Sequence, residues 1–301
     1  MNMVQPRIRQ YIAWMTIAVA GLTAGVVHAQ EHAPAPNGPA PVLVTVREML
    51  KPGDEAAHAR LEAEYTAVLK SGNGSEYYLG MGAITGKQQV MFLSGYSSLE
   101  EMADVHDYNE TMLGERLDKI DSAHGGTLAG TNTAIWRLRA DLSNPDPVSL
   151  GKMRFMELTQ IHVKLGHGPE FAELVKQIKA GWMKTDPDFH YLLYQQTLGD
   201  SKDDSYLAVI AVKSLAELDK HHSMMAKYQQ DLGENTYKHM LDFESANYDG
   251  TVSNLFVFTP DMSRLPASWI QDDEAFWEAK PAAAVPAKKE APAKKGAAYK
   301  K

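Results

Sequence analysis

Two side chains able to bind a polar ligand, Arg47 and His162, occupy aligned places in two similar segments. Residues 44–57 resemble residues 159–172, and the offset of 115 between them sets Arg47 against His162. An arginine and a histidine in a partly desolvated cavity can bind an anionic or carbonyl-bearing ligand. We therefore predict that these two residues belong to one ligand site.

Strand periodicity suggests further members of this site. Valines alternate with other residues in 42–47, and a similar alternation runs through 155–162, as expected for strands with two different faces. If the valine face packs on helices, the opposite face of each strand points into the interior. The expected ligand-binding residues are Arg47, His162, Gln160 and Thr45, together with Tyr191 from a later strand. The alternative is that Arg47 and His162 reach solvent at strand ends and that Tyr191 only packs.

Metal and nucleophile chemistry have little support in the pattern. The chain has no Cys, and residues 42–280 contain neither His-x-x-x-His nor HExxH. The side chains of the adjacent pair His221 and His222 would point about 100° apart on a helix, so they could not easily coordinate one metal ion together. No G-x-S-x-G or phosphate-binding glycine loop is present. We predict no metal site and assign no catalytic residue.

The elements that must position these side chains occur twice. Residues 98–102 return as 214–218 at an offset of 116, close to that of the first pair, and a shared offset indicates a duplicated unit. Each copy is predicted to begin with a strand and an amphipathic helix. Unit 2 shows the helical spacing most clearly, with apolar residues Phe171, Leu174, Val175, Ile178 and Trp182. In unit 1 the matching apolar face is Ala57, Leu61, Tyr65, Val68 and Leu69.

Two strands, a second helix and a last strand complete each unit. The strand pairs are expected at 77–83 and 89–96, and at 190–197 and 206–212. The second helices begin with Ser98-x-x-Glu101 and Ser214-x-x-Glu217, which are capping boxes, and run to about 123 and 246. The last strands are expected at 134–139 and 254–259. Each unit thus has the β-α-β-β-α-β order of a ferredoxin-like fold.

This order, the unit length and the duplication resemble the dimeric α+β barrel superfamily, which includes antibiotic-biosynthesis-monooxygenase-like and NIPSNAP-like domains. The resemblance covers residues 41–264. It implies an α+β fold of two tandem ferredoxin-like units that form a pseudo-dimeric barrel with helices outside. It also implies a small molecule in the barrel interior, either bound or converted by a cofactor-independent monooxygenase, an isomerase or a haem enzyme. No cofactor is predicted from the residues themselves; haem enters only through the resemblance, with His162, His190 or His222 as axial ligand.

The two ends of the chain predict export. Arg7 and Arg9 precede an apolar stretch at 11–27, and a small-x-small site ends at Ala29, so residues 1–29 are predicted to be a signal peptide of a periplasmic or secreted protein. A membrane anchor is the alternative. A Pro/Ala-rich linker at 30–41 would lead into unit 1 at 42–143, linker 144–151, unit 2 at 152–264, an extension at 265–280 and a disordered tail at 281–301.

Charge separates the tail from the folded body. The tail holds six Lys and one Glu and residues 1–41 hold two Arg and one Glu, so residues 42–280 carry a net charge of −14 within the total of −8. An acidic body argues against nucleic-acid binding by the folded part. The basic tail could contact an anionic envelope surface or remain solvated without a partner. Oligomers are compatible with the sequence.

Overall fold

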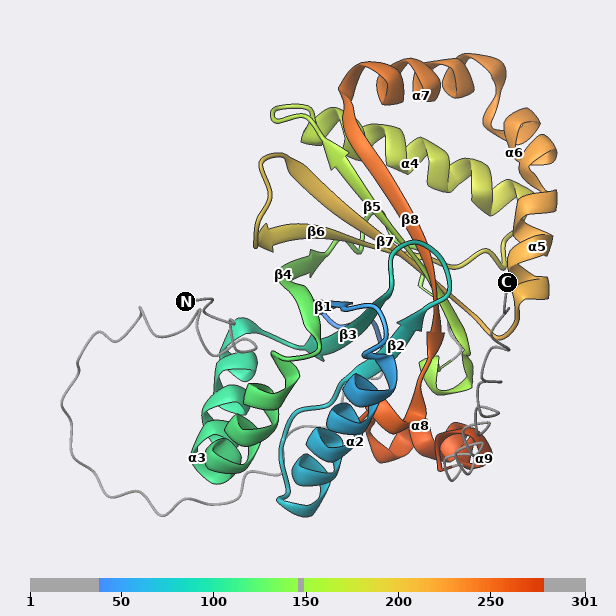
Figure 1. Cartoon of the computed structure of the whole chain (residues 1–301). Helices are drawn as coiled ribbons and strands as arrows, with labels where there is room; N and C mark the ends of the chain where they lie inside the picture. Colours follow the sequence, from blue (N-terminus) through green and yellow to red (C-terminus); the bar gives the residue numbers. More distant parts are fainter. Residues whose placement is uncertain (1–37, 146–148, 279–301) are drawn as a thin grey trace, which may run out of the picture.

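Eight antiparallel strands close into one barrel with helices on its outside (Figure 1). The computed structural model describes residues 38–145 and 149–278. The predicted signal peptide, most of the linker at 30–41 and the tail at 281–301 lie outside the described residues. Within the described part, no helix has both the length and the apolar character needed to cross a bilayer. The expected mixed α+β fold and barrel are confirmed.

Each half of the chain supplies four neighbouring strands. In the barrel order, the first half contributes β4-β1-β3-β2 and the second half β8-β5-β7-β6, with β2 pairing to β8 and β4 to β6. The strands of the first half are β1 (Val42–Leu50), β2 (Leu79–Ala83), β3 (Gln89–Tyr96) and β4 (Leu128–Leu138). Those of the second half are β5 (Phe155–Val163), β6 (Leu192–Leu198), β7 (Asp204–Val212) and β8 (Tyr248–Phe258).

The helices of the two halves lie on opposite sides of the barrel (Figure 1). The first half has α2 (Glu55–Ser71) and α3 (Leu99–His124), and the second has α4 (Gly168–Thr185), α5 (Leu215–Ser223), α6 (Met225–Leu232) and α7 (Glu234–Asn247). Three short helices stand where the first half has the continuous α3. Gly233 separates α6 from α7 with a φ of 86°, a conformation that costs glycine little.

The predicted strand faces are confirmed for β1. Val42, Val44 and Val46 pack in the core between sheet and helices, whereas Leu43 packs in the barrel interior. The last strands are longer than predicted, since β4 and β8 both begin six residues earlier. Their first residues alternate between half-buried and exposed, and the segment after Leu128 is rich in Gly, Thr and Asn, so it lacks the apolar period that marks a strand in sequence.

The helix starts differ in how far they match prediction. Ser98 Oγ accepts a hydrogen bond from the Glu101 N–H at 3.0 Å, so the first cap is confirmed. Ser214 makes no such bond, and Glu217 accepts instead from the Lys213 N–H at 2.8 Å. On the predicted apolar face of α4, Phe171, Leu174 and Val175 are buried as expected, and Ile178 and Trp182 are half-buried. On α2 the most buried face is His58, Glu62, Thr66 and Leu69. Of the predicted apolar residues only Leu69 belongs to this face, and the other four are half-buried beside it.

The two halves align with an offset of 113 at their first strands, so the predicted equivalence of Arg47 and His162 is wrong by two residues. The ladder of β1 shifts register between Met49 and Leu50, and that of β5 shifts between His162 and Val163. The turns that follow contain Gly53 and Gly166, both with a φ of 91°. Arg47 therefore corresponds to Gln160, and His162 corresponds to Met49. The error arose because the sequence match paired Gly53 with Gly168 rather than with Gly166.

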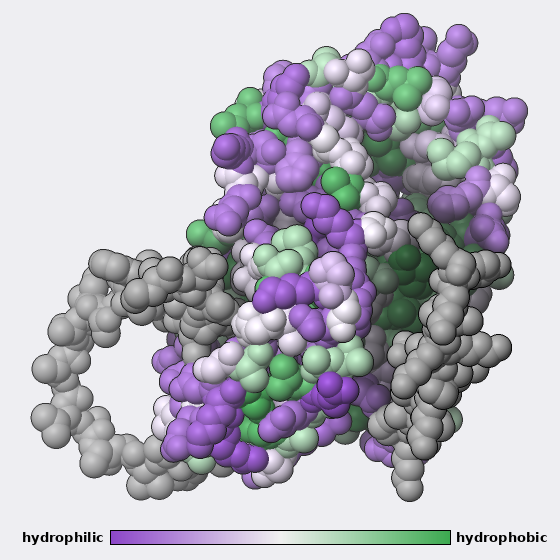
Figure 2. Space-filling view, in the orientation of Figure 1, coloured by the Kyte–Doolittle hydropathy of each residue, from purple (hydrophilic) through white to green (hydrophobic). Residues whose placement is uncertain are grey.

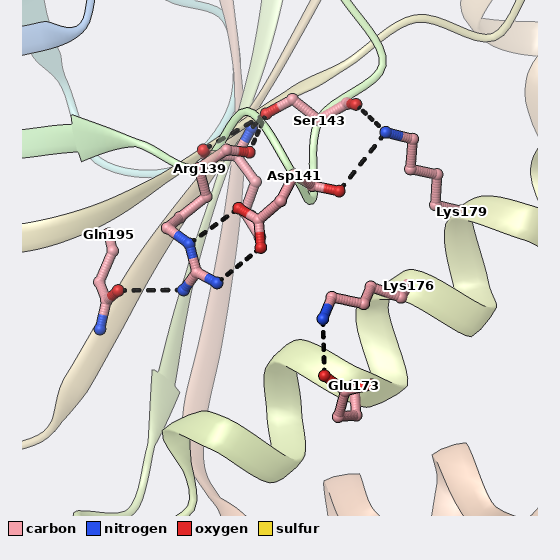
Figure 3. Close-up of polar contacts among 8 residues, drawn as sticks. Arg139, Asp141, Ser143, Glu173, Lys176, Lys179 and Gln195 are labelled. Atoms are coloured by element: carbon pink, nitrogen blue, oxygen red, sulfur yellow. Dashed lines mark hydrogen bonds and ion pairs between the residues drawn. The ribbon is translucent and has the colours of Figure 1, made fainter.

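The segment after each last strand packs into the opposite half. Leu142, fully buried, belongs to the core beneath α4, and Met262 belongs to the core beneath α2. Arg139 and Asp141 fix the first of these segments through paired hydrogen bonds, which hold the pKa of Asp141 below its usual range (Figure 3). Lys179 from α4 donates to the Asp141 and Ser143 carbonyls. Each half therefore completes the other half's core.

A short C-terminal segment covers one end of the barrel. It comprises α8 (Ala267–Asp272) and α9 (Glu274–Trp277), and Trp277 Nε1 donates to the Gly151 carbonyl at 2.7 Å. Arg154 lies 3.8 Å above the Phe276 ring and pairs with Asp273. We call the barrel end where β1 and β5 start, which this segment covers, the cap end, and the other end the far end.

Candidate ligand-binding site

A cavity of about 410 Å³ opens at the cap end of the barrel. Its volume lies within the range of small-molecule sites. The wall comes from inward-facing residues near one end of the strands and from the segments around them: Gly38–Ala40, Leu43, Leu79, Leu93, Met153, Met156, Leu192, Tyr194, Val209, Ala211, Leu265, Pro266 and Trp269 among others. Most of these side chains are apolar, so the cavity suits a largely apolar molecule.

Packed side chains separate this cavity from the far end. Trp136 on β4 is 3 % exposed, and its Nε1 donates to Thr45 Oγ1 on the neighbouring strand β1 at 3.0 Å. Met81, Met91, Leu158 and Phe256 are buried in the same interior core. The barrel therefore has a solid middle rather than a continuous channel, and a ligand in the cavity is confined to the cap end.

His190 offers the cavity an imidazole. It lines the cavity, and its Nδ1 is buried without a hydrogen-bond partner among the described residues. Leaving a buried polar atom unpaired is costly, so a ligand that supplies a hydrogen bond there gains from it. Tyr194 Oη is already used, since it donates to the Ala40 carbonyl at 3.2 Å. Burial raises the pKa of Tyr194, so its phenol stays neutral.

The surface agrees with an apolar hollow at this level of the molecule. Figure 2 shows mainly hydrophilic helix exteriors, whereas apolar surface gathers in a hollow between α5 and the α8–α9 segment. Besides His190 and four tyrosines, the polar side chains that line the cavity are Ser149, Ser268 and Asp272.

The predicted residues Arg47, Gln160 and Thr45 face the barrel interior but do not line this cavity. Thr45 is the acceptor for Trp136 in the solid middle. Arg47 and Gln160 are half-buried and lie toward the far end. Burial lowers the pKa of Arg47, and among the described residues no carboxylate lies within ion-pair distance of it. Arg47 is thus a partly desolvated cation at the far end of the barrel.

His162 belongs to a separate hydrogen-bonded group at the far end. Its Nδ1 lies 3.0 Å from Asp203 Oδ2 and 3.0 Å from Ser205 Oγ. Burial tends to raise the pKa of Asp203, but hydrogen bonds from Ser205, Ser201 and His162 outweigh it and lower that pKa. Among the described residues, no hydrogen bond joins Arg47 to His162. The two residues that the sequence joined therefore stand in different polar environments.

Tyr191 is the one predicted site residue that lines the cavity. Its ring also packs beside Phe189 and against the core beneath α4. Burial raises the pKa of Tyr191 to about 12, so its hydroxyl stays protonated at neutral pH. Whether Tyr191, Thr45, Arg47, Gln160 or His162 binds a ligand stays a prediction.

The cavity residues do not suit haem. Of the three histidines considered, only His190 lines the cavity, while His162 lies at the far end and His222 is exposed on α5. Two propionates need cationic partners, yet the lining residues include no Lys or Arg and do include Asp272. We therefore derive no step through haem.

Sequence reasoning missed a buried polar cluster between sheet and helices. His58, Glu62 and His124 bring ligating atoms within 4.8 Å of one another, and all three side chains are buried. The signal was present in the sequence as His58-x-x-x-Glu62, a pair four residues apart that shares one helix face. The search for His-x-x-x-His and HExxH excluded it.

Comparison with known proteins identifies the fold. No family model and no curated protein matches the chain. An anthrone oxidase-like protein is similar with a TM-score of 0.51 and 10 % identity, over 72 % of this chain and 91 % of that one. A putative monooxygenase from Fusobacterium nucleatum gives 0.50 and 13 %, over 73 % and 93 %. A chlorite dismutase from Candidatus Nitrospira defluvii gives 0.45 and 12 %, over 74 % and 92 %.

The chain has the fold of the dimeric α+β barrel proteins. The first two similarities carry this statement, because they extend over nearly the full length of the compared chains. At 10 % and 13 % identity they show shared architecture alone. The chemistry must therefore be argued from this chain's own residues.

Proposed function

We propose that this protein binds a small, largely apolar molecule in the cap-end cavity, with His190 as its principal polar contact. The observation that carries the proposal is a cavity of about 410 Å³ with a mostly apolar wall and one buried, unpaired imidazole nitrogen. Transfer of apolar surface from water drives such binding, and a hydrogen bond to His190 orients the ligand. A planar aromatic molecule with one hydroxyl or carbonyl group has the required chemistry.

Two probes that differ by one hydroxyl test this. We expect 1-naphthol to bind the wild type more tightly than naphthalene in calorimetric titrations, by roughly 5- to 10-fold for a net hydrogen bond of about 1 kcal/mol. His190→Leu should abolish the preference while still binding naphthalene. His222→Leu, an exposed histidine, is the matched control and should keep it. Equal affinities for both probes in the wild type would contradict the role of His190.

A second candidate is oxygenation of such a ligand without a cofactor. The similar structures include a putative monooxygenase and an anthrone oxidase-like protein, and His190 is suited to act as a base beside an apolar pocket. In this reaction His190 takes a proton from the activated CH₂ of an anthrone, and the carbanion passes electrons to O₂. One oxygen atom becomes the carbonyl of the product and the other leaves as water. General-base removal contributes about 10²- to 10⁴-fold in rate.

Oxygen uptake separates catalysis from binding. With anthrone as the probe, an oxygenase should consume one O₂ per quinone formed, and His190→Gln should slow this at least 100-fold while anthrone still binds. If anthrone binds but O₂ uptake does not exceed the rate in buffer, the protein binds this ligand without oxidising it. A Soret band in protein purified after export would instead indicate haem and contradict both candidates.

The two halves also support a duplicated origin. We infer two tandem ferredoxin-like units because matching register shifts, turn glycines and lysine contacts recur in both. Lys51 Nζ donates to the Gly126 carbonyl and Lys164 Nζ to the Ala246 carbonyl, both at 2.7 Å. In the barrel, β1 lies between β4 and β3, and β5 lies in the same way between β8 and β7.

Export and surface contacts are further parts of the proposal. We infer that residues 1–29 direct the chain to the periplasm or outside the cell and that the basic tail meets an anionic envelope surface. N-terminal sequencing of the exported protein should give Gln30 as the first residue. A retained Met1 in the membrane fraction would make the segment an anchor. Sedimentation with anionic vesicles, with and without residues 281–301, tests the tail.

A further inference from the structure

Three elements of the first half bring ionisable side chains together away from the ligand cavity. Glu48 comes from β1, His58 and Glu62 from one face of α2, and His124 from the last residue of α3. Relative exposure is 0 % for the first three and 3 % for His124. Ionisable residues are seldom buried this completely unless they are paired or bind a metal.

The distances between donor atoms suit a metal ion. In a tetrahedral site with bonds of about 2.0–2.1 Å, ligand atoms lie roughly 3.3 Å apart. Glu62 Oε1 lies 3.0 Å from His124 Nε2 and 3.6 Å from His58 Nε2. Glu48 Oε2 lies 2.7 Å from His58 Nε2, close enough to become a fourth ligand after a small shift.

The neighbouring groups also fit a metal site. Asp121 Oδ1 lies 3.8 Å from His124 Nδ1, which is ion-pair distance but longer than a hydrogen bond. His58 Nδ1 is buried and has no hydrogen-bond partner among the described residues. Asp121 also borders a small cavity of about 80 Å³, which offers an approach for an ion. The absence of Cys leaves nitrogen and oxygen as donors.

The second half shows that the fold does not require this polar cluster. By the structural offset of 113, Glu48, His58 and Glu62 correspond to Ile161, Phe171 and Val175. Those three pack in the apolar core beneath α4. An apolar filling of the same place is therefore compatible with the architecture, and the polar set in the first half calls for its own explanation.

We propose that His58, Glu62 and His124, with Glu48 as fourth ligand, bind one first-row divalent transition metal. Imidazole and carboxylate donors suit Zn²⁺ and its neighbours. A dication offsets the charge of the two buried carboxylates. Because four side chains fill the coordination sphere and almost no surface is exposed, the site is structural. It ties β1, α2 and the end of α3 together.

Zinc titration of untagged, chelator-treated full-length protein tests the proposal. We expect one equivalent of Zn²⁺ per chain by calorimetry and elemental analysis, with a higher melting temperature. Co²⁺ in place of zinc should give the intense visible absorption of a tetrahedral site. Glu62→Gln and His124→Ala should lose at least 10-fold in affinity. The exposed residues His222 and His239 supply matched controls as alanine variants, and these should bind zinc like the wild type.

A variant that carries the corresponding residues of the second half separates loss of zinc binding from loss of folding. Glu48→Ile, His58→Phe and Glu62→Val together should give a folded protein whose melting temperature no longer responds to zinc. Zinc binding by this triple variant at wild-type affinity would place the ion elsewhere and overturn the proposal. So would a wild type that takes up no stoichiometric metal, which would make the cluster a metal-free network of histidine–carboxylate pairs.

Discussion

Ser143 and Ser263 make matching hydrogen bonds to opposite halves of the barrel. Ser143 Oγ accepts from the Leu193 N–H of β6 at 2.9 Å and donates to the Arg139 carbonyl at 2.8 Å. Ser263 Oγ accepts from the Gly80 N–H of β2 at 3.0 Å and donates to the Thr259 carbonyl at 2.7 Å. Each serine ends one half and holds a strand of the other, so the halves exchange their closing segments.

This exchange predicts that the two halves unfold together. Leu142→Ala and Met262→Ala each empty a place in the opposite half's core, and each should cost about 2–5 kcal/mol. Urea unfolding should remain a single transition in both variants, by circular dichroism and by tryptophan fluorescence. Stable folding of residues 42–143 expressed alone would contradict the interdependence.

The cap segment should contribute both stability and closure. Trp277→Ala removes a ring that packs on the barrel interior and a hydrogen bond to Gly151, so we expect a loss of about 3–5 kcal/mol. Trp277→Phe keeps most of the ring and should cost only about 1 kcal/mol, the value of the hydrogen bond. Chemical denaturation measures both. Equal losses would mean that the ring packing contributes little.

Acid sensitivity should depend on His221. Burial lowers the pKa of His221 from the ordinary 6.5, against the opposing effect of Asp186 at 3.2 Å. The unfolded chain therefore binds this proton at a higher pH than the folded one. Stability from the neutral ring is present above pH 6.5 and declines as the pH falls through that value toward the folded pKa.

The matched comparison uses the neighbouring histidine. His221→Gln should show a smaller drop in melting temperature between about pH 7.5 and pH 5.5 than the wild type, because it has no ring to protonate. His222 is exposed on the same helix, and His222→Gln should follow the wild type. A wild-type pH profile in His221→Gln would show that other groups determine the acid response.

The sequence predicted the fold well because apolar periodicity reflects the core directly. The valine face of β1 and the apolar face of α4 are confirmed on those grounds. It failed on α2, where the buried residues include His58 and Glu62 and a hydrophobic pattern assigns such side chains to the surface. Local departures from pattern of this kind are expected at functional sites.

The candidate ligand site was only partly predictable for a geometric reason. Alternation along a strand identifies the inward face, and it did so for Thr45, Arg47 and Gln160, but it does not tell which end of the barrel is hollow. That depends on Trp136, which packs inside the barrel, and on the cap residues 265–277, which lie more than 200 residues after β1 in the sequence. Neither relationship has a local signal in the sequence.

A calorimetric titration with 1-naphthol on two identical substitutions tests the central claim most directly. Ala211 lines the cap-end cavity, whereas Ala83 packs against the same interior core and does not line the cavity. Ala211→Trp fills the cavity and should abolish binding, while Ala83→Trp should keep the wild-type affinity, provided that both variants give the wild-type circular dichroism spectrum. Loss of binding in Ala83→Trp with retention in Ala211→Trp would place the ligand at the far end, beside Arg47, and contradict the account.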